Sequence, residues 1–395
     1  MASPALMTTP LGAWSFKPRM AGLNRLEWAE RRLYGTTGVE EVIAELQRRK
    51  PTVGLILGHN RLQDDGCVRL FEYLCSDKRQ HDYMQEIALN NTQLGDRGVL
   101  AVAKYLCDNK GLKELQLQNN VFSGRAEIWT TFTSALNRSH LRRLTLSSNQ
   151  QLSDEFLAAF LATLSSPHFE ELILSFVGLT CESVPTIVEF LGSPRARSLK
   201  HLTLNGNELG RDGLFLIIDA VEKSNFHLTR CEMYANWSTN DEEERRIWNE
   251  AVARLSQATT RNQVLGRNTG REALILLRHA RPALLQHAEQ GEEQPPQPRL
   301  PNELILHILS FFAPTLSAPQ RRRVVDYASD ARTLPPLPQG PPPLGGPQVV
   351  TSGFIGSLRY VPLPAVLEAR TEWLIKVQCD AYDHEPGSIR YVIPD

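Results

Sequence analysis

The stretches LILGHNRLQDDGCVRLFEYL (residues 55–74) and IALNNTQLGDRGVLAVAKYL (residues 87–106) share one pattern of apolar and small residues. In each, two apolar residues alternate, a polar residue comes three positions later, and a leucine and a glycine follow. Alternation with a period of two predicts a short strand with one buried face. Apolar residues three and four apart after the glycine predict a helix. Each stretch is therefore expected to form one strand followed by one helix.

The same pattern recurs through more than half of the chain. Its copies start at residues 55, 87, 115, 144, 172, 202 and 231, which are 28 to 32 residues apart. One unit of this size cannot bury its own apolar face, so consecutive units must stack and share a core. An asparagine recurs where the chain leaves each strand, and its amide can hydrogen-bond the backbone of its own and adjacent turns. The expected ladder is Asn60, Asn120, Asn149, Asn207 and Asn236, with Thr92 and Val177 in place of asparagine.

The repeat resembles the ribonuclease-inhibitor-like leucine-rich repeats, the long subclass with a full helix in each repeat. The resemblance covers about residues 51–255. It implies an α/β solenoid with parallel strands on a concave face and helices on a convex face, followed here by a small helical C-terminal region. Residues 22–50 are expected to be an N-terminal cap that has the helix of a repeat but no clear strand.

Side chains that flank the buried leucines are expected to face outward on the concave side and to bind a protein client. This surface is polar, with few aromatic residues, and no row of Lys or Arg runs along it, which disfavours nucleic acid. The candidate client-binding residues are Glu86, Glu114, Gln116, Arg143, Glu171, Ile173, His201, Arg230 and Tyr234.

Composition and motifs exclude several classes of function. Lys and Arg number 43 and Asp and Glu 44, so no global basic field exists for nucleic acid. No apolar run approaches the roughly 18 residues of a membrane span, and no signal peptide is recognisable. Six cysteines without a CxxC pair suit a reducing, intracellular compartment, cytoplasmic or nuclear. Phosphate-loop, zinc-hydrolase and nucleophile motifs are missing and the histidines are dispersed, so we expect no enzyme activity, cofactor or metal site.

The segment RLPNELILHILSFFAP (residues 299–314) lies outside the repeat frame and predicts an apolar helix. It resembles the first helix of the F-box at Leu300, Pro301, Glu303, Leu304, Ile308 and Leu309. The resemblance implies binding to the Skp-type adaptor of cullin-based (SCF) ubiquitin ligases. Two features depart from that family: VVDYASDARTL stands where F-boxes usually have a tryptophan, and the segment follows the repeats instead of preceding them.

These patterns predict an ordered series of segments. They are a disordered N-terminus (1–21), the cap (22–50), a solenoid of about seven repeats (51–255), a helical C-terminal cap (256–290) in which Thr269 and Glu272 form a capping box, a linker (291–299), the F-box-like helical segment (300–333), a Pro/Gly-rich linker (334–347) and a segment of unknown fold (348–395).

Three functions fit this organisation. The leading hypothesis is a non-enzymatic scaffold that joins a client bound by the repeats to a ubiquitin ligase. The second is a leucine-rich-repeat binding protein whose C-terminal helices only pack on the solenoid cap. The third is a GTPase-activating protein of the Ran type, since these proteins resemble the chain in fold, although their usual acidic tail is not found here.

Overall fold

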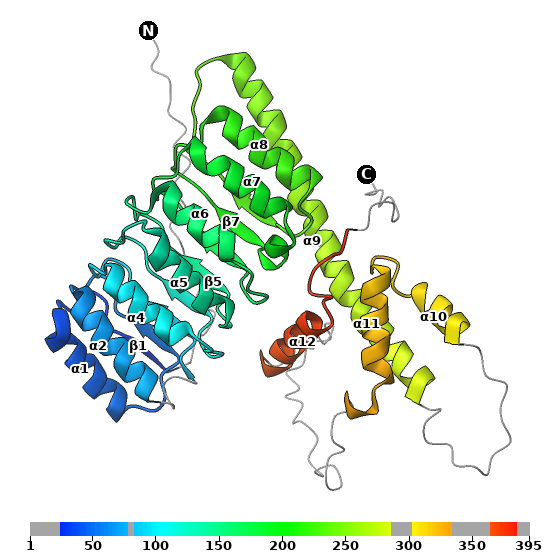
Figure 1. The fold of residues 1–395 in the computed structure, drawn as a ribbon, viewed down its shortest axis with the longest axis horizontal. Coiled ribbons are helices and arrows are strands. Elements are labelled where there is room, and N and C mark those ends of the chain that lie inside the picture. The colour runs from blue at the N-terminus through cyan, green and yellow to red at the C-terminus, as the bar shows by residue number, and fades with distance from the viewer. Residues whose placement is uncertain (1–23, 78–82, 286–301, 334–363, 385–395) are drawn as a thin grey trace, which may run out of the picture.

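The structure is a computed structural model of the 395-residue chain, and it describes residues 24–77, 83–285, 302–333 and 364–384. In these residues a short strand alternates with a helix through most of the chain (Figure 1). The strands are β1 (Arg25–Glu27), β2 (Gly54–Ile56), β3 (Glu86–Ala88), β4 (Glu114–Gln116), β5 (Arg143–Thr145), β6 (Glu171–Ile173), β7 (His201–Thr203) and β8 (Arg230–Glu232).

The strands form one parallel sheet in the order β1 to β8, each paired with the next in the same register. The helices between them are α1 (Gly35–Arg48), α2 (Gln63–Ser76), α4 (Asp96–Leu106), α5 (Ala126–Asn137), α6 (Ser153–Thr163), α7 (Val184–Gly192) and α8 (Gly210–Lys223), with 3₁₀ turns at Cys181–Ser183 and Pro194–Ser198. They pack side by side along one face of the sheet, which does not close into a barrel (Figure 1). The expected repeat solenoid of parallel strands and helices is confirmed at this level.

The first strand corrects the sequence analysis, which expected no clear strand in residues 22–50. Leu26 is 1% exposed and pairs with Leu55, so β1 adds a full repeat before the seven expected ones. The signal was present: Leu26 precedes Leu55 by 29 residues, and Leu26 and Trp28 alternate.

The leucines of the repeat are buried between the sheet and the helices. Leu55, Leu57 and Leu62 are fully buried, as are their equivalents in the next four repeats, whereas Cys231 in the last repeat is only partly buried. A glycine allows α2 to begin close to α1, since a Cβ on Gly66 would lie 2.7 Å from the carbonyl oxygen of Gly35. The small residue is therefore required for stacking.

The asparagine ladder is present at all five expected positions. Asn120 shows the pattern: its Nδ2 donates to the carbonyl oxygens of Leu89 and Leu117 at 2.9 Å, and its Oδ1 accepts from the backbone N–H of Thr92 and Leu94 at 3.0 Å. Equivalent amide-to-carbonyl bonds are made by Asn60, Asn149, Asn207 and Asn236. Valine at position 177 has no side-chain amide for the ladder, and its N–H donates to Oδ1 of Asn207 just as the N–H of Asn120 donates to Oδ1 of Asn149.

One 44-residue helix, α9 (Glu242–Leu285), joins the solenoid to the C-terminal region. The boundary expected between residues 255 and 256 falls inside it, and the predicted capping box is wrong. Thr269 lies within the helix, where its hydroxyl donates to the carbonyl oxygen of Leu265. Glu272 instead accepts from the backbone N–H and the hydroxyl of Thr315, at 2.7 and 2.6 Å.

The two halves of α9 belong to different hydrophobic cores. Ala251, Leu255 and Ala258 close the end of the solenoid core. The second core is built from the far half of α9 together with α10 (Asn302–Ser310), α11 (Ala318–Ser329), a 3₁₀ turn (Ala331–Thr333) and the chain after α12 (Pro364–Lys376). Its buried residues are Ala273, Leu276, Ala280, Leu309, Ala313, Leu316, Val324, Ala328, Val377 and Cys379.

The segment after α12 fastens this second core to the solenoid. Arg197, in the turn before β7, donates to the carbonyl oxygens of Gln378 and Ala381 at 2.6 and 3.1 Å and forms an ion pair with Asp383. From the other side, Nε2 of Gln320 on α11 donates to the same two carbonyl oxygens at 2.8 Å. The C-terminal region is thus fixed to the solenoid by two separate elements.

Candidate functional site

The face of the sheet that carries no helix displays the first and third residues of each strand. Eight of the nine candidate client-binding residues belong to these strands: Glu86, Glu114, Gln116, Arg143, Glu171, Ile173, His201 and Arg230, while Tyr234 follows β8. They therefore lie on one surface, as expected from their spacing. Their accessibility to a protein client differs, because the side chain of Ile173 is 3% exposed and that of Tyr234 is 71% exposed.

The charged residues of this face pair with one another across the strands. We call Arg25, Glu86, Glu114, Arg143, Glu171 and His201 the ion-pair row. Arg143 lies 3.2 Å from Glu114 and 2.5 Å from Glu171, and Nδ1 of His201 lies 3.7 Å from Glu171. Because each charge faces an opposite one, the row has little net field with which to attract a charged client.

A glycine allows the first pair of this row to form. Arg25 on β1 crosses β2 and reaches Glu86 on β3 at 2.6 Å. A Cβ on Gly54, the intervening residue of β2, would lie 2.8 Å from Nε of Arg25. Burial raises the pKa of Glu86 above its ordinary value, and the facing charge of Arg25 offsets only part of that effect.

Exposed aromatic residues lie where the chain leaves the strands. Phe176 is 49% exposed and has a φ of +57°, a left-handed conformation that is costly for a bulky side chain. Its ring covers Gly206, whose Cβ position would be 2.1 Å from a ring carbon. Together with Tyr234, it gives this edge the apolar contact area that protein-binding surfaces usually contain. The sequence offers Phe176 as an aromatic anchor for a partner, although it is not among the nine candidate client-binding residues.

Helix α10, where the resemblance to the F-box lies, packs against the second core on one side and is exposed to solvent on another. Leu309 is 5% exposed in the second core, whereas Leu304 and Ile308 are 47% and 46% exposed. Phe311 and Phe312, just beyond the helix, are also exposed, and Phe312 stacks on His279 of α9. Of the other candidate residues here, Leu300 and Pro301 lie outside the described residues, as does the side chain of Glu303.

A pocket of about 410 Å³ opens beside this exposed stripe. Leu276 of α9, Leu309 and Ser310 of α10, and Ala318, Arg321, Arg322, Val325 and Asp326 of α11 line it. Its walls are mainly apolar and two arginines stand at its sides. A pocket of this kind accepts an apolar anchor residue with an acidic neighbour.

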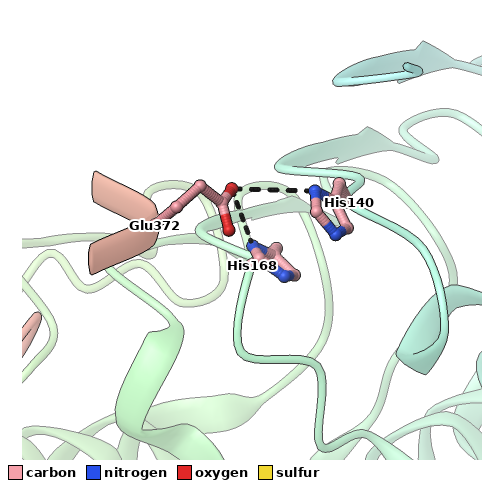
Figure 2. A group of neighbouring side chains, drawn as sticks. All are labelled: His140, His168 and Glu372. Atoms are coloured by element: carbon pink, nitrogen blue, oxygen red, sulfur yellow. Dashed lines mark ion pairs between the residues drawn. The ribbon is translucent and has the colours of Figure 1, made fainter. Parts of the chain in front are cut away.

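Three titratable side chains from distant parts of the chain meet at the other edge of the solenoid. His140 lies in the loop before β5, His168 in the loop before β6, and Glu372 on α12 (Figure 2). Oε1 of Glu372 is 3.6 Å from Nδ1 of His140 and 3.7 Å from Nδ1 of His168. The two imidazole rings stack with centroids 3.8 Å apart.

Sequence analysis missed this cluster because Glu372 is far from both histidines along the chain. One signal was available: the histidines are 28 residues apart, which is one repeat, so the solenoid places them side by side. Burial lowers the pKa of both histidines below the ordinary value, and each has further positive charge nearby. Both imidazoles are therefore neutral at pH 7.

The chain matches no protein-family model, and no curated protein matches it significantly. Among the helices that the structure describes, none combines the length and apolar character needed to cross a membrane.

Proposed function

We propose that the protein is a non-enzymatic scaffold whose solenoid belongs to the ribonuclease-inhibitor-like leucine-rich repeats. The helix-free face of the sheet binds a protein client. The surface formed by Leu304, Ile308, Phe311 and Phe312, with the pocket beside them, binds the Skp-type adaptor of a cullin-based ubiquitin ligase. We call this surface the α10 surface.

The observation that carries the proposal is the exposure of four large apolar side chains on one short segment. Leu304, Ile308, Phe311 and Phe312 are between 43% and 73% exposed. Burying a leucine, isoleucine or phenylalanine fully is worth roughly 1.5–3 kcal/mol, so leaving four of them half in water forgoes several kcal/mol. Grouped exposure of this kind usually marks a surface that a partner covers.

The hypothesis that the C-terminal helices only pack on the solenoid cap fits α11 but not α10. Val324 and Ala328 of α11 are fully buried against α9, so α11 has a structural role. Among the side chains of α10 that the structure describes, Leu309 belongs to that core, whereas Leu304 and Ile308 are exposed. A purely structural C-terminus explains α11 but gives no reason for the apolar side chains at Leu304 and Ile308.

The state of the cysteines supports an intracellular location. All six are free, and burial raises the pKa of Cys231 and Cys379 to about 12, which keeps their thiols protonated and unreactive. A chain with six free cysteines suits a reducing compartment.

The test is a binding measurement between the purified chain and a Skp-type adaptor by calorimetry. We expect wild type to bind with a Kd of about 10 µM or tighter. The double substitution Leu304→Glu/Ile308→Glu should weaken binding by roughly 100-fold or more, because two apolar anchors are replaced by charges that the complex would bury.

The matched control is a second double substitution to glutamate, at exposed apolar residues away from the α10 surface. Leu216 on α8 and Val252 on α9 are 56% and 39% exposed, so Leu216→Glu/Val252→Glu adds two carboxylates at similarly exposed apolar positions. This variant should bind the adaptor as wild type does. Absence of wild-type binding at about 100 µM, or equal weakening by both double variants, removes the ligase proposal.

A further inference from the structure

We propose that His140, His168 and Glu372 form a binding site for a divalent transition-metal ion of the Zn²⁺ class, which clips α12 to the solenoid. This site is separate from the helix-free face of the sheet and from the α10 surface. The proposal does not depend on the ligase function.

The distances within the cluster fit a shared ion better than direct bonds. A direct N–H···O hydrogen bond spans about 2.7–3.2 Å, and the Nδ1 atoms of His140 and His168 lie 3.6 and 3.7 Å from Oε1 of Glu372. Bonds from zinc to imidazole nitrogen and carboxylate oxygen are both near 2.1 Å, so two ligand atoms around one ion are roughly 3.5 Å apart. All three candidate ligand atoms lie within 4.8 Å of one another.

The ring arrangement also brings both nitrogens to the same side. In Figure 2 both imidazoles present Nδ1 to a single carboxylate oxygen. The rings are close to parallel, with 22° between their planes, so each ring must turn about its terminal side-chain torsion, which is a soft one, before both lone pairs converge on an ion.

Charged groups of both signs surround the two histidines. The His168 side chain is 12% exposed and that of His140 22% exposed, so both rings are largely out of water. Positive neighbours are Lys110, Lys113 and Arg142, and Asp380 is the further acidic group facing the pair. The strongest opposing charge, Lys113, is itself paired with Glu368 at 3.0 Å, which reduces its repulsion of an ion.

Two imidazole nitrogens and one carboxylate oxygen indicate the class of metal. Imidazole suits Zn²⁺ and its transition-metal neighbours, whereas Ca²⁺ and Mg²⁺ prefer shells of oxygen ligands. Three protein ligands leave a fourth position for water in a tetrahedral site. Since the ligands come from two solenoid loops and from α12, the ion would join parts of the chain that are 204 residues apart (372 minus 168).

The chain supplies a closely matched pair of variants on one helix. Glu372→Gln removes the proposed ligand, and Glu368→Gln removes the same charge one turn earlier, from a residue that forms its ion pair with Lys113 and lies within electrostatic range of His140. Both side chains are at least one-third exposed, at 37% and 51%, so neither change disturbs the core.

The experiment titrates the metal-free full-length chain with Zn²⁺ under reducing conditions by calorimetry, and separately with Co²⁺ by visible absorption. We expect one ion per chain, with the intense absorption of four-coordinate cobalt. Glu372→Gln should lower the affinity at least about tenfold, as should His168→Asn, and Glu368→Gln should lower it much less, because it exposes the charge of Lys113 but removes no ligand. Cys75 and Cys181 are exposed and bind zinc weakly in any such titration, so the difference between variants is the measure.

Hydrogen exchange gives a second readout that does not depend on affinity alone. Zn²⁺ should slow exchange in α12 of wild type and of Glu368→Gln, and should leave α12 of Glu372→Gln unchanged. Mg²⁺ should protect none of them. The proposal is overturned if wild type shows no saturable Zn²⁺ binding, if Glu372→Gln binds as tightly as wild type, or if the two glutamate variants lose affinity equally.

Discussion

Individual polar side chains in this protein satisfy backbone groups or charges that belong to another repeat. Asn120 bonds three backbone segments at once, and an unmade bond to a buried carbonyl costs about 1–3 kcal/mol. Arg25 passes over an entire strand to reach Glu86, which only the glycine between them permits. The stability of each repeat therefore depends on residues about 30 positions away.

His227 makes one consequence measurable. Burial lowers the pKa of His227 from 6.5 to about 4. The nearby positive charge of Arg197 acts in the same direction, and Asp383 opposes both with a smaller effect. The unfolded chain therefore binds a proton more readily, so stability falls as the pH drops from about 6.5 to about 4. The loss is on the order of 3 kcal/mol, since each pKa unit corresponds to about 1.4 kcal/mol.

Urea unfolding at pH 7.5 and at pH 5 measures the larger part of this loss, about 2 kcal/mol. His227→Gln keeps the size and polarity of the side chain and removes its titration, so its unfolding midpoint should vary less with pH than that of wild type. His59→Gln, at a position exposed to solvent, is the control and should follow wild type. An identical pH dependence in all three proteins would show that burial of His227 has no such effect.

Helices in this fold are positioned by the residues with which they begin. The N-cap side chains of α2, α4 and α5 make no capping hydrogen bond, and at α4 the preceding repeat supplies one instead: Oδ1 of Asp64 accepts from the N–H groups of Gly95 and Gly98 at 2.7 and 2.9 Å. Gly66 in the first turn of α2 is pressed against the backbone of α1, whereas Gly266 in α9 has no atom within 4 Å of its Cβ position.

The two glycines should respond in opposite ways to alanine. Gly66→Ala should destabilise the protein by roughly 1–3 kcal/mol, because the new methyl group meets a backbone oxygen that cannot move alone. Gly266→Ala should stabilise it by about 0.5–1 kcal/mol, because alanine loses less conformational entropy in an unobstructed helix. Thermal unfolding of the two variants measures both effects, and a stabilised Gly66→Ala would contradict the close-packing argument.

The molecule as a whole consists of a solenoid and a second core held together by α9 and by the segment after α12. Arg197 is the central connection between them, since its guanidinium reaches two carbonyl oxygens and Asp383 in that segment. Hydrogen bonds to a charged group are worth about 1.5–3 kcal/mol each. The attachment of the second core therefore depends strongly on one solenoid side chain.

Replacing Arg197 should loosen the attachment without unfolding the solenoid. In Arg197→Met, residues 377–383 should exchange amide hydrogens at least about tenfold faster than in wild type, which corresponds to 1.4 kcal/mol or more. Arg195→Met is the matched control, because Arg195 donates to Leu161 and Ala162 within the solenoid. Equal exchange in the two variants would show that Arg197 does not hold the segment.

Much of the solenoid could be predicted from local patterns alone. Leu55, Leu57 and Asn60 recur with a nearly constant spacing, and this repetition predicts strands, register and ladder, because stacked identical units allow only one arrangement of their buried faces. Where the pattern was weak the prediction failed: β1 was missed, although Leu26 and Trp28 carry its alternation.

Outside the repeat, only the tertiary structure showed where helices end, which side chains bond one another and which are exposed. No local pattern shows that α9 continues for 44 residues, that Glu272 bonds Thr315 instead of capping a helix, or that α10 keeps Leu304 and Ile308 in solvent. The meeting of His140 and His168 with Glu372 depends on how α12 packs across two solenoid loops. The sequence alone determined what repeats, since periodic burial is a local property, and the tertiary structure determined which distant side chains meet, since that depends on non-periodic packing.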